Sequence, residues 1–207
     1  MTTVAPTCHA ADIAAFSIAS GLCTFSPIPF TESAMRRAVE RRMARVIASR
    51  YGALLSPEQL SQIVPDPHGS LFGSAARVAL FIPLRRLFRR IFKLLAWNAA
   101  IDNVSRTYHL GYLLAVAGAR VHPFPDPLRL HEAITTTTSQ IGVHPIRELV
   151  RRALRGGYDM PNSETSDDVV EALRPLGESL ATILRTYANK HFAHAEAVLL
   201  RELGVAT

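Results

Sequence analysis

Two histidines near the end of the chain form the densest group of side chains that could do chemistry. They lie in the sequence His191-Phe192-Ala193-His194-Ala195-Glu196. On a helix the two histidines would share a face, whereas Glu196 would point elsewhere. Zinc proteases need histidines four residues apart with a glutamate after the first, and that spacing is absent. The pair could contribute to a metal site with unidentified further ligands, but surface or partly buried histidines are the favoured interpretation.

Motifs that would identify a common enzyme class are absent from the sequence. There is no G-x-S-x-G nucleophile elbow, no dinucleotide-binding glycine pattern and no phosphate-binding G-x-x-x-x-G-K-[ST] loop. Cys8 and Cys23 give no disulfide framework and no metal-ligand spacing, so we interpret them as small apolar residues in a reducing compartment. We expect a non-enzymatic protein without a cofactor. The alternative is a cryptic enzyme or metal protein that uses His191 and His194.

The sharpest local feature is a basic amphipathic segment from Pro83 to Trp97. On a helical wheel its apolar side chains cover a continuous arc of about 160°. That arc consists of Leu84, Leu87, Phe88, Ile91, Phe92, Leu94 and Leu95. The opposite arc holds Arg85, Arg86, Arg89, Arg90 and Lys93, with Trp97 on the same basic side. No acidic residue occurs between Asp66 and Asp102, so no ion pair within the helix can neutralise this face.

This pattern leaves two interpretations open for the helix expected over residues 84–97. Its composition is typical of a helix that lies in an anionic membrane surface, with cations near phosphates and an indole at the interface. Alternatively, the apolar arc faces a soluble core, and the arginines meet an acidic protein partner or the chain's own carboxylates. Those carboxylates would be Glu164, Asp167, Asp168 and Glu171. Nucleic acid is an unlikely partner, because the aromatic residues are not interleaved with the cations.

The elements around this segment are all expected to be helices, which predicts an all-α bundle of αα-hairpins with no significant β-sheet. Residues 10–26 predict a buried or shallow re-entrant helix, too short and too polar to favour a transmembrane span. In the next helix Met35, Val39 and Met43 define the apolar arc, and Glu40 is placed on the opposite, arginine-rich side.

Gly52 is expected to end the helix that contains Met43, and Ser56 with Gln59 to form a capping box at the start of the next one, at 57–64. The pattern is helical again from Ser74, with a break at Pro83, and residues 84–118 could form one long helix or two. Further helices are expected at 127–138, 145–154 and 167–203, the last disturbed at Pro175.

Composition and charge suggest two regions that pack as one unit. The chain has 207 residues, 48% of them hydrophobic, with a net charge of +6. Residues 1–125 carry 14 basic and 6 acidic side chains, whereas residues 126–207 carry 9 and 11. The proline-rich stretch from His122 to Pro127 is the best boundary. We therefore expect a basic helical domain over 1–121 and a C-terminal helical region over 127–207, packed on the first.

Residues 17–55 read SIASGLCTFSPIPFTESAMRRAVERRMARVIASRYGALL. A small-residue helix, a Pro-Ile-Pro turn and a helix that ends I-A-x-x-Y-G are similar to the helical domain of unknown function in YcjF-type membrane proteins. That domain also occurs fused to, or encoded beside, Era-like GTPases. Residues Thr107 to Gly111 are similar to its T-Y-x-L-G segment. The similarity covers about residues 12–118 and implies a membrane-associated helical domain that acts with a GTPase or another partner.

The chain departs from that family in several respects. It has no GTPase domain, and the half after Pro127 has no recognisable counterpart. The family supplies no catalytic residues. The N-terminus has neither a basic region nor a clear cleavage site typical of a signal peptide. Together these features predict a cytoplasmic protein peripheral to the membrane, with a soluble helical protein–protein interaction module as the alternative.

Overall fold

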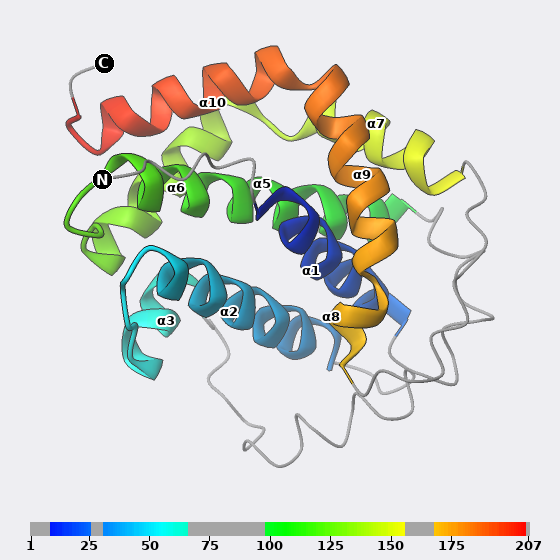
Figure 1. The fold of residues 1–207 in the computed structure, drawn as a ribbon, viewed down its shortest axis with the longest axis horizontal. Coiled ribbons are helices and arrows are strands. Elements are labelled where there is room, and N and C mark those ends of the chain that lie inside the picture. Colours follow the sequence, from blue (N-terminus) through cyan, green and yellow to red (C-terminus); the bar gives the residue numbers. More distant parts are fainter. Residues whose placement is uncertain (1–8, 26–30, 66–97, 156–167, 206–207) are drawn as a thin grey trace.

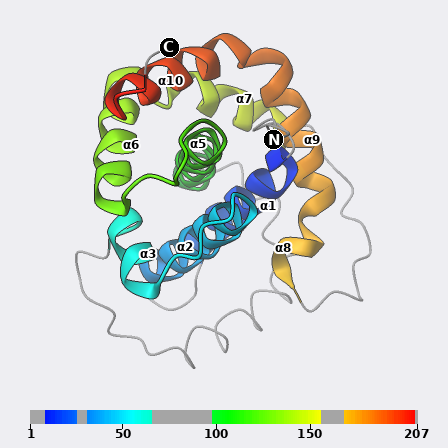
Figure 2. The ribbon, with the colours of Figure 1, turned by 60° about the vertical axis from the view of Figure 1, so that its left-hand side comes forward.

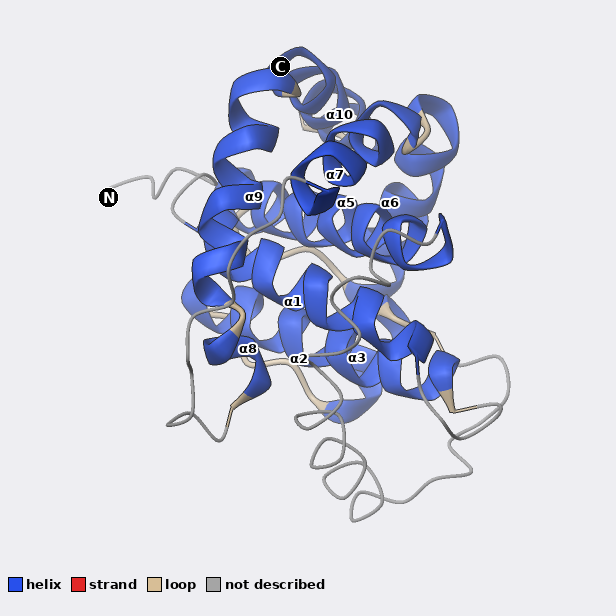
Figure 3. Cartoon of the chain, turned by 90° about the vertical axis from the view of Figure 1, so that its right-hand side faces the viewer, coloured by secondary structure: helices blue, strands red, loops and turns tan. Residues whose placement is uncertain are grey.

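The computed structural model describes residues 9–25, 31–65, 98–155 and 168–205. Within these ranges every regular element is a helix and no strand occurs, which confirms the all-α prediction (Figure 3). The helices are α1 (Ala10–Leu22), α2 (Glu32–Arg50), α3 (Pro57–Ile63), α5 (Asn98–Arg120), α6 (Pro127–Ile141), α7 (His144–Arg155), α8 (Val169–Ala172), α9 (Arg174–Tyr187) and α10 (Asn189–Glu202) (Figure 1). A 3-10 turn, η2 (Cys23–Phe25), follows α1.

Helix α5 occupies the centre of the bundle. Figure 2 shows it almost end-on, with α1 and α2 on one side and α6, α7 and α10 on the others, and each of these five helices contacts it. Most of its side chains between Ala100 and Ala119 are buried. A helix enclosed in this way needs apolar or small residues around its whole circumference, and the sequence of α5 supplies them.

Helix α1 is the second buried element. All of its residues from Ile13 to Leu22 are buried, because α2, α5 and α9 pack around it (Figure 1). The prediction of a buried helix is therefore confirmed. Among the described residues, no helix combines the length and apolarity needed to cross a bilayer.

Two glycines allow backbones to approach closely around α1. A Cβ atom on Gly21 would lie 2.5 Å from Val104 Cγ2 and 3.0 Å from the carbonyl oxygen of Ala100 on α5. A Cβ atom on Gly177 of α9 would lie 2.5 Å from the carbonyl oxygen of Ala11 and 2.8 Å from the amide nitrogen of Ala15. Because these neighbours are mainly backbone atoms, they cannot move aside as a flexible side chain would. Helix α9 can therefore dock on α1 only through a residue without a side chain.

The helix caps that the sequence predicts are present in the structure. Ser56 and Gln59 form the predicted capping box at the start of α3: the Gln59 amide donates to Ser56 Oγ at 3.2 Å, and the Ser56 amide donates to Gln59 Oε1 at 2.8 Å. Gly52 follows α2 with a φ of +78°, as its predicted role at the helix end requires. The start predicted at Pro127 is also observed, with Asp126 as the cap.

The region expected over residues 167–203 is divided more finely than predicted. Its described part, from residue 168, consists of the three helices α8, α9 and α10, and Pro175 lies in the first turn of α9, where its missing N–H is tolerated. A further break occurs at Ala188, between α9 and α10. Helix α6 also continues to Ile141, through threonines of low helix propensity. Helices before and after the stretch from His122 to Pro127 share one hydrophobic core.

A substitution at Gly177 tests the close approach of α9 to α1. We expect Gly177→Ala to lower the free energy of unfolding by about 1–3 kcal/mol, because the new methyl group overlaps backbone atoms of α1. Chemical denaturation followed by circular dichroism measures the change. Glu178→Ala, at the exposed neighbouring position, is the matched control and should have little effect. Equal stability of Gly177→Ala and the native chain would contradict the proposed packing.

Candidate functional site

The basic residues selected from the sequence lie outside the described residues. These are Arg85, Arg86, Arg89, Arg90, Lys93 and Trp97. Of the four carboxylates that could neutralise them, Glu164 and Asp167 also lie outside, whereas Asp168 and Glu171 are described. The surroundings of Asp168 and Glu171 therefore bear on where the basic segment finds its counter-charge.

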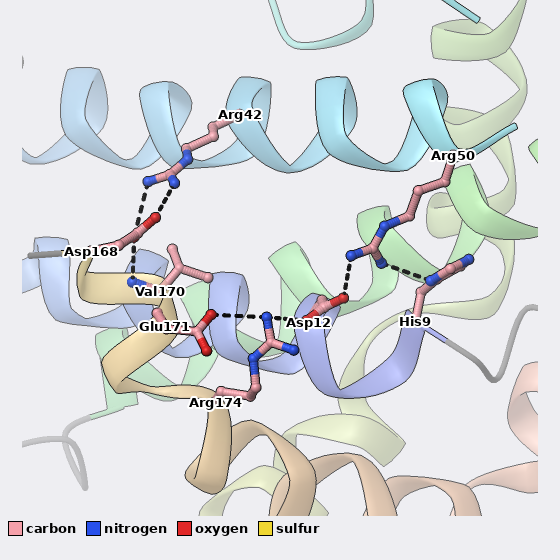
Figure 4. Close-up of polar contacts among 8 residues, drawn as sticks. All are labelled: His9, Asp12, Arg42, Arg50, Asp168, Val170, Glu171 and Arg174. Carbon is pink, nitrogen blue, oxygen red and sulfur yellow. Dashed lines mark hydrogen bonds and ion pairs between the residues drawn. The ribbon is translucent and has the colours of Figure 1, made fainter. Parts of the chain in front are cut away.

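Asp168 accepts hydrogen bonds from an arginine of α2 (Figure 4). Arg42 Nη1 donates to Asp168 Oδ1 at 3.1 Å, and Arg42 Nη2 contacts the other carboxylate oxygen. The amide of Val170 donates to the same carboxylate at 2.9 Å, which makes Asp168 the cap of α8. Partial burial raises the pKa of Asp168, but the bonds from Arg42 and Val170 outweigh it, and the pKa lies below its ordinary value.

A second ionic group joins α1 to both α2 and α9, with Asp12 at its centre (Figure 4). Asp12 lies 2.6 Å from Arg50 Nη2 and 3.5 Å from Arg174 Nη2. Arg174 also contacts Glu171 at 2.9 Å. Arg50 donates to Nδ1 of His9 at 2.7 Å, and burial together with the charge of Arg50 lowers the pKa of His9. Asp168 and Glu171 thus both face arginines of the described helices.

Glu40 corrects the sequence interpretation, which placed it on the outer side of α2. It is buried, with 6% of its surface exposed. Thr107 Oγ1 donates to Glu40 Oε1 at 3.0 Å, and Thr107 lies 2.8 Å from Ser20 Oγ on α1. On a helical wheel Glu40 lies only about 60° from Met43, at the margin of the apolar arc. Burial raises the pKa of Glu40, although Arg36 at 3.4 Å and Thr107 act in the opposite direction.

Cys23 belongs to the same interior and is not a reactive thiol. It is 1% exposed, and its thiol donates to the carbonyl oxygen of Ala19 at 3.3 Å. Burial, and then the charge of Glu40, raise the pKa of Cys23 to about 12. A thiol with this pKa carries almost no thiolate at neutral pH, so its predicted role as a small apolar residue agrees with its surroundings.

The structure places His191 beside a histidine that sequence reasoning had not selected, His109 of α5. The centroids of the two imidazole rings lie 5.5 Å apart, and the ring planes are nearly perpendicular. His109 is fully buried, and neither of its ring nitrogens has a hydrogen-bond partner among the described residues. The same holds for the buried Nε2 of His191. No local spacing could have shown this pair, since its members are more than 80 residues apart.

The electrostatics of this pair favour neutral imidazoles. Burial, and then the charge of His191, lower the pKa of His109 to about 4. Burial, and then the charge of His194, lower the pKa of His191. His191 is half-buried and His194 is exposed, which agrees with the favoured interpretation of these two histidines, and the imidazole ring of His109 lies beside that of His191. Within the described ranges, no group of three or more histidine, cysteine or acidic side chains could hold a metal ion.

Comparison with known proteins gives no family. No protein-family model, curated protein or solved structure matches the chain. The similarity of residues 12–118 to the YcjF-type domain stays a prediction from the sequence.

The buried histidine predicts a pH-dependent stability. In the unfolded chain His109 becomes protonated below about pH 6.5. In the folded chain its imidazole stays neutral until the pH falls to about 4. Stability is therefore lost as the pH falls from 6.5 to 4. We expect His109→Leu to remove this contribution, so that the difference in unfolding free energy between variant and native chain changes by roughly 3 kcal/mol across this window. Urea titrations at pH 7 and pH 4 measure it. A constant difference would show that His109 is solvated.

The position of Asp12 predicts a salt-sensitive contribution to stability. We expect Asp12→Ala to lower the free energy of unfolding by about 1 kcal/mol, because two arginines lose their shared counter-charge. The loss should shrink in 1 M salt, where exposed charges are screened. Thermal unfolding at low and high ionic strength provides the measurement. Glu132→Ala, at an exposed acidic position on α6, is the control. An effect of Asp12→Ala that is independent of salt contradicts an electrostatic origin.

Proposed function

We propose that this chain is a non-enzymatic helical protein that associates peripherally with the cytoplasmic face of a membrane. The contact element is the basic segment 84–97. Its cations Arg85, Arg86, Arg89, Arg90 and Lys93 meet anionic headgroups, and Trp97 lies at the interface. In the sequence this segment lies between α3 and α5.

The observation that carries the proposal is the charge balance of the chain. Residues 66–97 contain six basic side chains and one acidic side chain. The remainder of the protein contains 17 basic and 16 acidic side chains, so it has no surplus of negative charge to offer. The segment therefore keeps a large positive charge unless counter-charge comes from outside the molecule.

The ion pairs of the described helices support this balance. Several carboxylates of the described helices each contact an arginine of another or the same described helix. Asp102 lies 2.8 Å from Arg147, and Glu196 lies 2.8 Å from Arg120. Asp168 and Glu171, the described carboxylates that the alternative interpretation requires, contact Arg42 and Arg174. These four described carboxylates are thus already in contact with other arginines.

A membrane surface suits the segment better than an acidic protein does, because cations and large apolar residues alternate along it. An anionic interface accepts both kinds of side chain at once: the cations interact with phosphates, and Phe88, Ile91 and Phe92 enter the acyl boundary. An acidic protein partner, including a GTPase, would need an apolar groove beside its charges. We place such a partner second.

Liposome flotation tests the proposal. We expect the native chain to float with vesicles that contain about one third anionic lipid and to remain at the bottom with neutral vesicles. Reversal of the five cations to glutamate should abolish flotation. The matched control reverses five exposed cations of the described helices, and it changes the net charge equally. These are Arg45, Arg106, Arg152, Arg185 and Lys190.

The two variants separate a specific contact from general attraction. Loss of flotation in the segment variant alone supports the proposal. Equal loss in both variants means that net charge acts without a defined contact element, which contradicts it. Flotation that persists in the segment variant, or that ignores the anionic lipid content, also contradicts it.

A further inference from the structure

We propose that His109 of α5 and His191 of α10 bind one copper(I) ion between them. This site is independent of the basic segment and of the membrane contact. The first argument is the state of the two rings. A buried polar group without a hydrogen bond costs roughly 1–3 kcal/mol. Among the described residues, His109 has two such nitrogens and His191 has one. Each neutral imidazole has one nitrogen with a free lone pair and one N–H, so a ligand that accepts one lone pair from each ring would remove the cost at the two lone-pair nitrogens.

The separation of the rings agrees with a shared ion. Imidazole nitrogens bind such metals at about 2.0 Å, so two rings on one ion have centroids roughly 5–6.5 Å apart, depending on the bond angle. The observed distance of 5.5 Å lies within this range and is shorter, by under about 1 Å, than the roughly 6.3 Å that a linear arrangement requires, so binding in a line needs the two rings to move apart slightly. No hydrogen bond joins the two rings directly. We assign as donor atoms the buried Nε2 of His191 and one ring nitrogen of His109, whose other nitrogen carries the proton of the neutral ring.

The chemistry of the surroundings selects the ion. Phe192 lies against both rings, with centroid distances of 5.6 Å to His191 and 6.5 Å to His109. Tyr112 packs on Phe192 at 4.4 Å. An apolar aromatic site disfavours a divalent ion, because the cost of desolvation rises steeply with charge. Zinc(II) also prefers four ligands. Copper(I) is a monovalent closed-shell ion that binds imidazole and accepts two ligands in a line.

The two histidines have different roles in loading the site. His109 is fully buried, whereas His191 is half-buried on the outer helix α10, so the ion reaches His191 first. Both imidazoles are neutral at pH 7, because burial lowers the pKa of each, and no proton has to be displaced. Binding also ties α10 to α5, and a bound ion therefore stabilises the folded chain.

An anaerobic copper(I) titration against a chromogenic chelator tests the site. The full chain is used with Cys8→Ser and Cys23→Ala, which removes both thiols as competing ligands. We expect one copper(I) per chain, higher thermal stability of the loaded protein, and shifts of the ring nitrogen signals of two histidines in NMR spectra. His191→Phe and His109→Leu should each weaken binding by more than about 100-fold, since each removes one of two ligands.

His194→Ala is the matched control, because this exposed histidine lies on α10 only three residues from His191. It should leave copper(I) binding unchanged. Far-UV circular dichroism of the variants establishes that they fold, and His191→Phe alters only a half-buried position. Absence of stoichiometric binding, an equal loss in His194→Ala, or tighter binding of zinc(II) than of copper(I) would each overturn the proposal.

Discussion

The structure depends on the burial of α1, a helix of small residues enclosed by three others. Its alanine, serine and glycine residues leave room for α5 and α9 to approach its backbone. The approach to α5 is close at Gly21, and the approach to α9 is close at Gly177. Dispersion contacts at such short range are numerous, so a helix with few large side chains still holds its neighbours together. A larger residue at either glycine would separate helices that otherwise share one core.

Polar groups inside this core set the relative positions of the helices. Glu40, Thr107 and Ser20 form a chain of contacts that joins α2, α5 and α1. Each buried polar group costs energy unless its partner is correctly placed, so such a chain favours one arrangement over slipped alternatives. Outside the core, the ion pairs of Asp12 also fix the positions of α1, α2 and α9 relative to one another. Their contribution is smaller because Asp12 is partly exposed.

The sequence predicted features that arise from local rules. The all-α class, the capping box at Ser56 and the start of α6 at Pro127 all follow from periodicity and capping chemistry. Features that depend on contacts between distant segments were missed. Glu40 appeared exposed because a helical wheel does not show that Thr107 approaches its margin. His109 had no neighbour in sequence to mark it as half of a pair. The break at Ala188 carries no glycine or proline that would mark it in the sequence.

The contact between α1 and α9 has a consequence for synthesis of the chain. The surfaces that meet at Ala15 and Gly177 lie roughly 160 residues apart in the sequence. Helix α1 therefore leaves the ribosome long before α9, which covers one of its sides. Until α9 emerges, the apolar flank of α1 lacks this neighbour, and a nascent chain is then most exposed to aggregation. A chaperone that holds short apolar segments would act on α1 during this interval.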